Sequence, residues 1–184
     1  MKSIELVNQL EKDFILKELS DDWARYMPEL NDYLSTNFKE RSMGLVCDFA
    51  KEVNQVFTAV FPTNEIMQEI IREEITDAML FVHHPSIWDI RRSQPFYQMD
   101  KALLKQFRER RIAIYNLHVP LDNYNEYSTS KTLADALHIE IEKPFVKYRG
   151  SLCGVIGKTN CKSIDELKHL LSAALGHPVM LYQY

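Results

Sequence analysis

The pattern of hydrophobic and polar positions predicts helices that alternate with strands from residue 63 onward. Apolar residues recur at helical spacing in five segments, at 3–19, 63–75, 95–110, 128–138 and 164–175. Short runs of β-branched, aromatic or continuous apolar residues predict strands at 44–49, 53–61, 77–82, 111–117, 149–158 and 179–184. Alternation of this kind is typical of an α/β fold. We therefore expect a mixed, partly parallel sheet that is flanked by helices.

The polar segments indicate how the chain is divided. Residues 20–43 have no clean period and predict an irregular connector with one short helix. The pair Lys143–Pro144 is the best candidate for a boundary between two lobes. We expect a main α/β lobe over residues 1–143 and the start of a second lobe over 144–184. In that second lobe, Ser163 and Glu166 have the spacing of a capping box at the start of a helix.

Two proline-containing motifs each follow a buried predicted strand. They read FVHHPSIW at 81–88 and HVPLD at 118–122. One predicted helix separates the two strands, and a crossover of this length normally joins parallel strands. Pro85 and Pro120 disfavour helical backbone in the residue before them, so both motifs are interpreted as strand exits. Parallel strands end at the same edge of a sheet, which is where ligands bind in open α/β sheets.

This topology can bring together His83, His84, His118 and Asp122, although the two motifs are far apart in the sequence. Three imidazoles and a carboxylate suit a transition metal ion such as Zn, Fe or Mn better than Ca or Mg. The plainer alternative is that each histidine is a polar strand end that hydrogen-bonds to backbone. The matched position of the second motif favours the metal site.

Composition excludes several other classes of function. The net charge is −4 and the sequence pI is about 5.9, without the basic patch of a nucleic-acid-binding protein. No segment has the length of a membrane span, and the first residues, MKSIELVNQLEKDF, lack the apolar core of a signal peptide. The three cysteines include no C-x-x-C pair. We expect a cytoplasmic protein that binds neither nucleic acid nor membrane.

The two motifs also resemble those of a known family. DAMLFVHHPSIW at 77–88 and IYNLHVPLDN at 114–123 are similar to segments of the Nif-three-like proteins (NGG-one-interacting factor three), also called GTP cyclohydrolase I type 2 homologs. The resemblance covers about residues 44–160. It implies a Nif-three-like fold in which His83, His84 and Asp122 bind metal.

The resemblance leaves the role of His118 and the number of ions open. His118 matches a position beside the metals, where it could be a ligand, a support for the ligands or a proton carrier. The family also uses a histidine and a glutamate from an H-x-x-x-E motif near the C-terminus, and no convincing match is present. We therefore expect one or two divalent ions and a truncated second lobe.

Two functions follow from these expectations. In the first, the metal lowers the pKa of a bound water for hydrolysis of a nucleotide or another small phosphorylated substrate, with His118 as the catalytic proton carrier. Arg91 and Arg92 are possible anion contacts or plain surface charges. In the second, the protein is a metal-binding scaffold or regulatory interaction protein without turnover. A third, blander alternative is an α/β domain without metal. The resemblance also implies a homo-oligomer, from dimer to hexamer.

Overall fold

A four-stranded mixed sheet forms the centre of the first part of the chain. The computed structural model describes residues 1–88 and 96–182, and it divides the chain into two units, Met1–Pro120 and Leu121–Tyr184. The strands of the sheet are β1 (Gly44–Cys47), β2 (Gln55–Ala59), β3 (Ala78–Val82) and β6 (Ile112–Asn116). Their order is β1-β6-β3-β2. Because β3 is parallel to β2 and β6 while β1 is antiparallel to β6, the predicted mixed, partly parallel sheet is confirmed.

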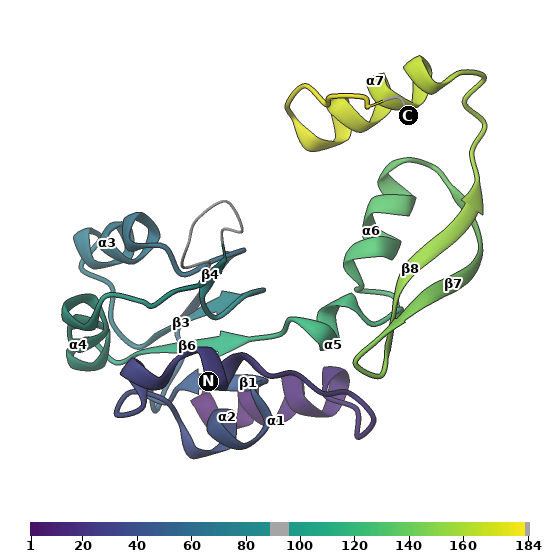
Figure 1. The fold of residues 1–184 in the computed structure, drawn as a ribbon. Helices are drawn as coiled ribbons and strands as arrows, with labels where there is room; N and C mark the ends of the chain where they lie inside the picture. Colours follow the sequence, from purple (N-terminus) through teal and green to yellow (C-terminus); the bar gives the residue numbers. More distant parts are fainter. Residues whose placement is uncertain (89–95, 183–184) are drawn as a thin grey trace. The chain divides into compact units, whose positions relative to one another are not determined.

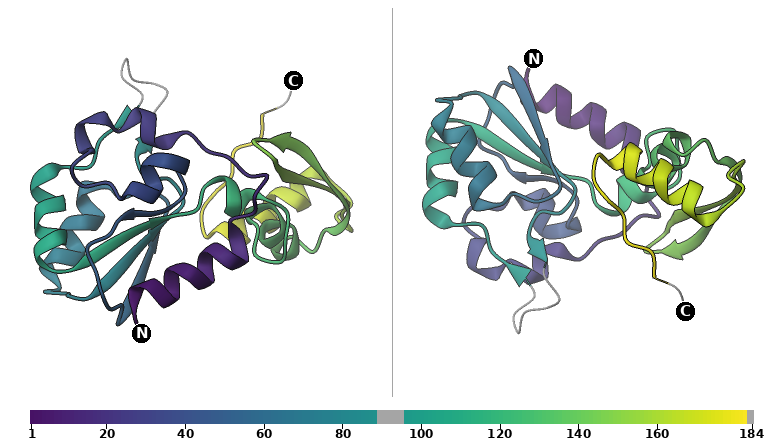
Figure 2. Two further views of the ribbon diagram at one scale, coloured as in Figure 1. Left: turned by 90° about the horizontal axis from the view of Figure 1, so that it is seen from below. Right: turned by 90° about the horizontal axis from the view of Figure 1, so that it is seen from above.

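Helices flank this sheet, as the hydrophobic pattern predicted (Figure 1). They are α1 (Ser3–Phe14), α2 (Thr36–Arg41), α3 (Asn64–Arg72) and α4 (Lys101–Glu109), with two short 3₁₀ helices, η1 (Trp23–Tyr26) and η2 (Pro28–Leu30). Helices α3 and α4 pack beside each other, whereas α1 and α2 lie against β1 (Figure 2). The predicted connector at 20–43 therefore contains η1, η2 and α2.

The core of the first unit lies between the sheet and these helices. Leu80 of β3 and Ile114 of β6 are fully buried, and they belong to the same cluster as Met67 of α3 and Phe107 of α4. Thr63 caps α3 by accepting a hydrogen bond from the backbone N–H of the residue three positions later. The buried strands of the first unit hold the site described below on a rigid base.

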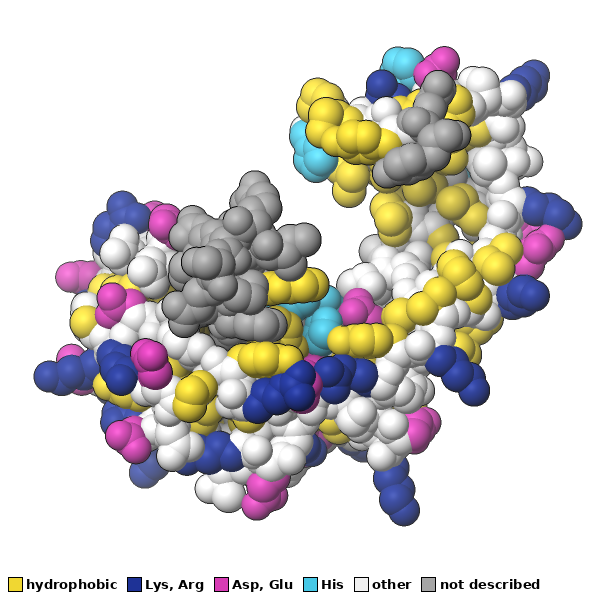
Figure 3. Space-filling model, viewed as in Figure 1, with side chains coloured by type: hydrophobic (Ala, Val, Ile, Leu, Met, Phe, Trp, Pro, Cys, Tyr) yellow, Lys and Arg dark blue, Asp and Glu magenta, His cyan; other side chains and the backbone are white. Residues whose placement is uncertain are grey.

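The second unit contains a β-hairpin and two helices. Its elements are α6 (Thr129–Ala136), β7 (Glu140–Tyr148), β8 (Ser151–Lys158) and α7 (Ile164–Leu175), and α5 (Val119–Asp122) spans the boundary with the first unit. Strands β7 and β8 pair in antiparallel fashion. None of the residues of α7 is buried, and apolar side chains of this unit reach the surface (Figure 3).

The boundary between the units differs from the one that we expected. The units divide between Pro120 and Leu121, whereas Lys143–Pro144 lies inside β7. Pro144 has no N–H to donate, but a strand with only one neighbour has a free edge on which proline is tolerated. The capping box was predicted correctly, because Ser163 accepts a hydrogen bond from the N–H of Glu166 at 3.2 Å.

Two predicted helix ends and one predicted strand were wrong. The first helix ends at Phe14. The helix predicted at 95–110 begins at Lys101, because Asp100 accepts hydrogen bonds from the first backbone N–H groups of α4. The residues before it form β5 (Phe96–Tyr97), which pairs with β4 (Ile87–Trp88). The strand predicted at 179–184 is absent from 179–182, and its last two residues lie outside the described residues, as do 89–95.

Candidate metal centre

The two histidine motifs meet at one edge of the sheet because their strands are parallel neighbours. Val82, the last residue of β3, pairs with Asn116, the last residue of β6. His83 follows the first strand directly, and His118 follows the second after one intervening residue, Leu117. The N–H of Leu117 donates to the carbonyl of Val82 at 3.2 Å, which continues the pairing past the strand ends. The predicted crossover is therefore confirmed.

Three imidazoles converge at this edge. One ring nitrogen from each of His83, His84 and His118 lies within 4.8 Å of the others, and all three residues are half-buried. The ring centroid of His84 lies 4.5 Å from that of His83 and 4.7 Å from that of His118. Within residues 1–88 and 96–182, these three histidines form the group that could hold a metal ion.

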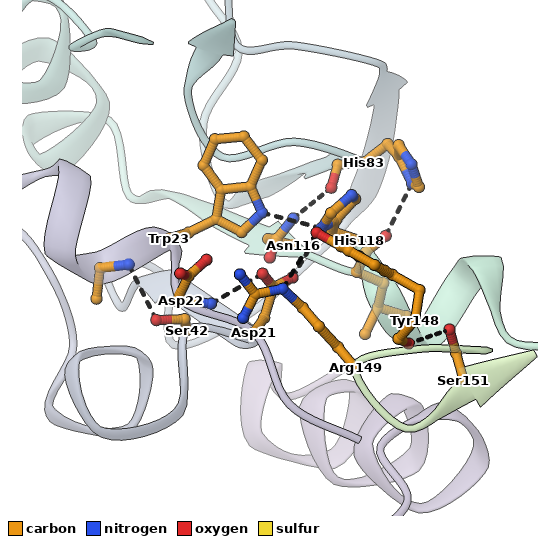
Figure 4. Close-up of polar contacts among 12 residues, drawn as sticks. Asp21, Asp22, Trp23, Ser42, His83, Asn116, His118, Tyr148, Arg149 and Ser151 are labelled. Carbon is orange, nitrogen blue, oxygen red and sulfur yellow. Dashed lines mark hydrogen bonds and ion pairs between the residues drawn. The ribbon is translucent and has the colours of Figure 1, made fainter. Parts of the chain in front are cut away.

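Backbone geometry sets the protonation of His83. Its Nδ1 lies 3.0 Å from the carbonyl oxygen of Leu117. A carbonyl oxygen can only accept a hydrogen bond, so Nδ1 carries the proton and the lone pair of the neutral ring is on Nε2. Asn116 supports the same residue, because its side-chain N–H donates to the backbone carbonyl of His83 (Figure 4). Histidines that bind metals typically have a partner on the other ring nitrogen.

His84 is held as a neutral ring. Phe61 stacks on it with a centroid distance of 4.9 Å, and the indole of Trp23 meets it edge-on at 5.3 Å. Burial, followed by the charges of His83 and His118, lowers the pKa of His84 to about 3. Its Nδ1 is buried and has no hydrogen-bond partner in the part of the chain that the structure describes. A buried ring nitrogen without a partner is costly unless a ligand satisfies it.

His118 has two polar neighbours from the connector between α1 and α2 (Figure 4). A carboxylate oxygen of Asp21 lies 2.8 Å from its Nδ1, and the side chain of Asp21 is only 2% exposed. The indole Nε1 of Trp23 lies 3.1 Å from the same nitrogen. The structure thus places His118 with the other two histidines.

Asp122, the fourth predicted residue, belongs to the second unit. It ends α5, and one of its carboxylate oxygens accepts a hydrogen bond from the hydroxyl of Thr129 at 2.9 Å. The residue before Pro120 is helical, contrary to our expectation, because proline is well accommodated in the first turn of a helix. The role of Asp122 as a metal ligand stays a prediction from its motif.

Sequence reasoning missed Asp21, Trp23 and Asn116. Asn116 carried a usable signal, because it is the one polar residue in the apolar run of β6 and is fully buried. Asp21 and Trp23 carried no such signal in the sequence, because they lie in a segment without hydrophobic periodicity.

The residues present fit a transition metal ion. They offer neutral imidazole nitrogens, which are good ligands for Zn and Fe, and one of these nitrogens is buried without a partner. Within the described residues, the group contains no carboxylate. A carboxylate is the usual bridge between two closely spaced cations, so the group by itself suits one ion better than two.

The first unit is a mixed α/β unit, and three histidines lie at the carboxyl edge of its parallel strands. This arrangement places the protein among candidate metal-binding proteins. The sequence model of the Duf34/NIF3 family (NGG1p interacting factor 3) matches residues 25–183. The chain belongs to this family, which confirms the resemblance seen in the two motifs.

Relatives and solved structures agree with this assignment. The GTP cyclohydrolase 1 type 2 homolog of Pyrococcus horikoshii is 29% identical over 119 residues, which cover 62% of this chain and 44% of that protein. The homolog of Pyrococcus abyssi is 30% identical over 134 residues, 70% of this chain and 51% of that protein. The chain therefore spans about half the length of the curated relatives that it matches.

Two solved structures share the fold. Protein ybgI, described as of unknown function, has a TM-score of 0.68 at 22% identity, over 96% of this chain and 61% of that one. Reduced HcgD from Methanocaldococcus jannaschii has a TM-score of 0.60 at 21% identity, over 94% of this chain and 60% of that one.

None of the helices in the described residues is long and apolar enough to cross a bilayer.

Proposed function

We propose that a divalent transition metal ion, Zn, Fe or Mn, binds at the cluster of His83, His84 and His118. The observation that carries this proposal is the convergence of three ring nitrogens within 4.8 Å at the end of two parallel strands. The hydrogen bond from His83 to a backbone carbonyl and the buried Nδ1 of His84 support it. Asp122 is retained as a further ligand on the strength of its motif alone.

When bound, such an ion acts as a Lewis acid that lowers the pKa of water. The protein's own residues orient the ligands and limit access of solvent. Asn116 and the carbonyl of Leu117 hold His83, and Phe61 stacks on His84. His118 takes one of two roles, because an imidazole nitrogen that binds a metal cannot also accept a proton. It either completes the ligand set or carries a proton for the reaction.

The activity that we propose is metal-dependent hydrolysis of a nucleotide or another small phosphorylated substrate. The names of the relatives, GTP cyclohydrolase 1 type 2 homologs, make GTP the first substrate to test. The second candidate is a metal-binding scaffold without turnover. Within the described residues the group holds no carboxylate, which disfavours a two-metal hydrolytic centre, whereas three imidazoles are also the ligand set of single catalytic zinc ions.

Metal analysis tests the site itself. Purified protein is dialysed against Zn, Mn or Fe(II), and its metal content is measured for wild type, His83→Ala and His84→Ala. We expect about one ion per chain in wild type and a large loss in both variants. His138→Ala is the matched control, because His138 is exposed in the second unit and should leave the metal content unchanged. Equally little metal in wild type and both site variants would refute the proposal.

Turnover then separates the two functions. If the metal-loaded protein hydrolyses GTP and His84→Ala does not, the hydrolase is supported. Metal binding without turnover of GTP or of a panel of nucleotides and sugar phosphates supports the scaffold. Sedimentation of the same samples tests the homo-oligomer, which stays a prediction together with the cytoplasmic location.

A further inference from the structure

The Nδ1 atom of His118 has two neighbours that demand opposite protonation states. The carboxylate of Asp21, at 2.8 Å, can only accept a hydrogen bond, so it requires a proton on Nδ1. The indole N–H of Trp23, at 3.1 Å, can only donate, so it requires a lone pair on the same atom. One ring nitrogen of a neutral imidazole cannot satisfy both. The two neighbours therefore favour different tautomers of His118.

The surroundings of Asp21 decide between these tautomers. Its side chain is only 2% exposed, and a buried carboxylate that lacks donors is costly. The backbone N–H of Asp22 donates to the first oxygen, Oδ1, at 2.9 Å, which leaves the second oxygen, Oδ2, facing His118. A hydrogen bond to a charged acceptor is about twice as strong as one between neutral groups. The proton therefore resides on Nδ1, and the lone pair lies on Nε2.

We propose that Asp21 is a positioning residue that holds His118 in the Nδ1–H tautomer, against the indole of Trp23, and thereby makes Nε2 of His118 a metal donor. The assignment of Nε2 as a metal donor rests on the proposed function, whereas the choice of tautomer does not. Both roles of His118 need this tautomer, since a metal ligand and a proton carrier each use the lone pair of Nε2.

His83 shows the same arrangement with a different partner. The carbonyl of Leu117 holds its proton on Nδ1, so both rings would present Nε2. The difference is charge, because a carboxylate also raises the basicity of the ligand that it supports. Asp21 thus gives His118 a stronger donor nitrogen than a backbone carbonyl would give.

The substitution Asp21→Asn is a sharp test because the neighbouring backbone fixes how the new amide points. The N–H of Asp22 needs an acceptor, so the amide oxygen takes the place of Oδ1. The amide NH₂ then faces Nδ1 of His118 and donates to it, as does Trp23. We expect the tautomer to reverse to Nε2–H, and the zinc affinity to fall by about 10- to 100-fold.

The measurement is long-range ¹H–¹⁵N NMR of protein labelled in its histidine rings, recorded without metal, together with zinc titration by calorimetry. His118→Ala identifies the signals of His118 by their absence. Asp22→Asn is the matched control for tautomer and affinity, because it removes an adjacent carboxylate that pairs with Arg25 and should leave both as in wild type. Trp23→Phe removes the competing donor and should keep the wild-type tautomer.

Four results are informative. An Nε2–H tautomer of His118 in wild type overturns the inference, and so does an Asp21→Asn variant with unchanged tautomer and zinc affinity. If Asp21→Asn reverses the tautomer but wild type binds no zinc, the proposed metal site fails while the control of His118 by Asp21 is supported. Reversal together with weakened zinc binding supports both.

Discussion

Asn116 offers a substitution whose cost to folding should be small although the residue is fully buried. Its side-chain N–H donates to the backbone carbonyl of His83, but its Oδ1 is buried without a hydrogen-bond partner among the described residues. Replacement by leucine, which has a similar shape, removes both the bond and the unsatisfied oxygen. Loss of the bond removes this donor from the buried carbonyl of His83, which costs about 1–3 kcal/mol. Removal of the unsatisfied oxygen offsets this by about 1–3 kcal/mol.

We therefore expect Asn116→Leu to change the free energy of unfolding by less than about 1 kcal/mol. Asn116→Ala should cost about 2–3 kcal/mol, because it also opens a cavity in a packed strand. Urea denaturation of the metal-free protein measures both values. The zinc affinity should nevertheless fall in both variants, since the backbone of His83 loses its support. A loss of more than about 3 kcal/mol for the leucine variant would show that Asn116 serves folding rather than the site.

Three further predictions concern metal, pH and the hairpin. Zinc at one hundred times its dissociation constant should raise the free energy of unfolding by about 2.7 kcal/mol, and a melting temperature indifferent to zinc would contradict this. The hydrogen bond from Arg111 lowers the pKa of Asp77 in the folded protein. The pair therefore contributes its full stabilisation above the pKa of an unfolded aspartate, about 3.9, and loses it as the pH falls through the lower pKa of the folded state. Denaturation of wild type and Asp77→Asn should therefore differ at neutral pH and converge in acid; a constant difference would be inconsistent. A Cβ at Gly157 would lie 2.5 Å from the backbone oxygen of Glu140, whereas a Cβ at Gly154 would meet only the movable side chain of Phe145. Gly157→Ala should therefore make the hairpin more sensitive to limited proteolysis than Gly154→Ala does. Equal cleavage of the two variants would count against this.

The central part of the fold was predictable because burial leaves a clear trace in the sequence. Strands β3 and β6 are covered on both faces, so they read as short, nearly continuous apolar runs. The helix between them is amphipathic, and Leu104 and Phe107 face inward as the periodicity indicated. Length and pattern together then leave few topologies other than a parallel crossover.

In the second unit, strand β7 was not predicted, whereas β8 was. Most residues of β7 are solvent-accessible, so the strand lacks the alternation that a half-buried strand shows. Pro144 reinforced the impression of a break, although it lies opposite Val155 and the pairing continues on both sides of it, with a register shift between Ile141 and Lys143. The start of α4 was a different kind of error, since Asp100 is a capping residue that could have been recognised.

The candidate site was predictable where it depends on strand ends and hidden where it depends on the connector. His83, His84 and His118 follow from two motifs in matched positions of the sheet. Asp21 reaches His118 across 97 residues of sequence, and no local pattern announces such a contact. It depends on how an irregular segment packs, which a single sequence does not reveal.

These sequence separations also determine when the site can assemble during folding. His83 contacts Leu117 over 34 residues, and Trp23 contacts His118 over 95 residues. Contacts of such long range form late, because the chain loses loop entropy before the contact returns any energy. During synthesis, Asp21 emerges from the ribosome long before His118, which must follow β6 into the sheet. A metal ion would therefore find its ligands only after the first unit has closed, and metal uptake would report completed folding of that unit.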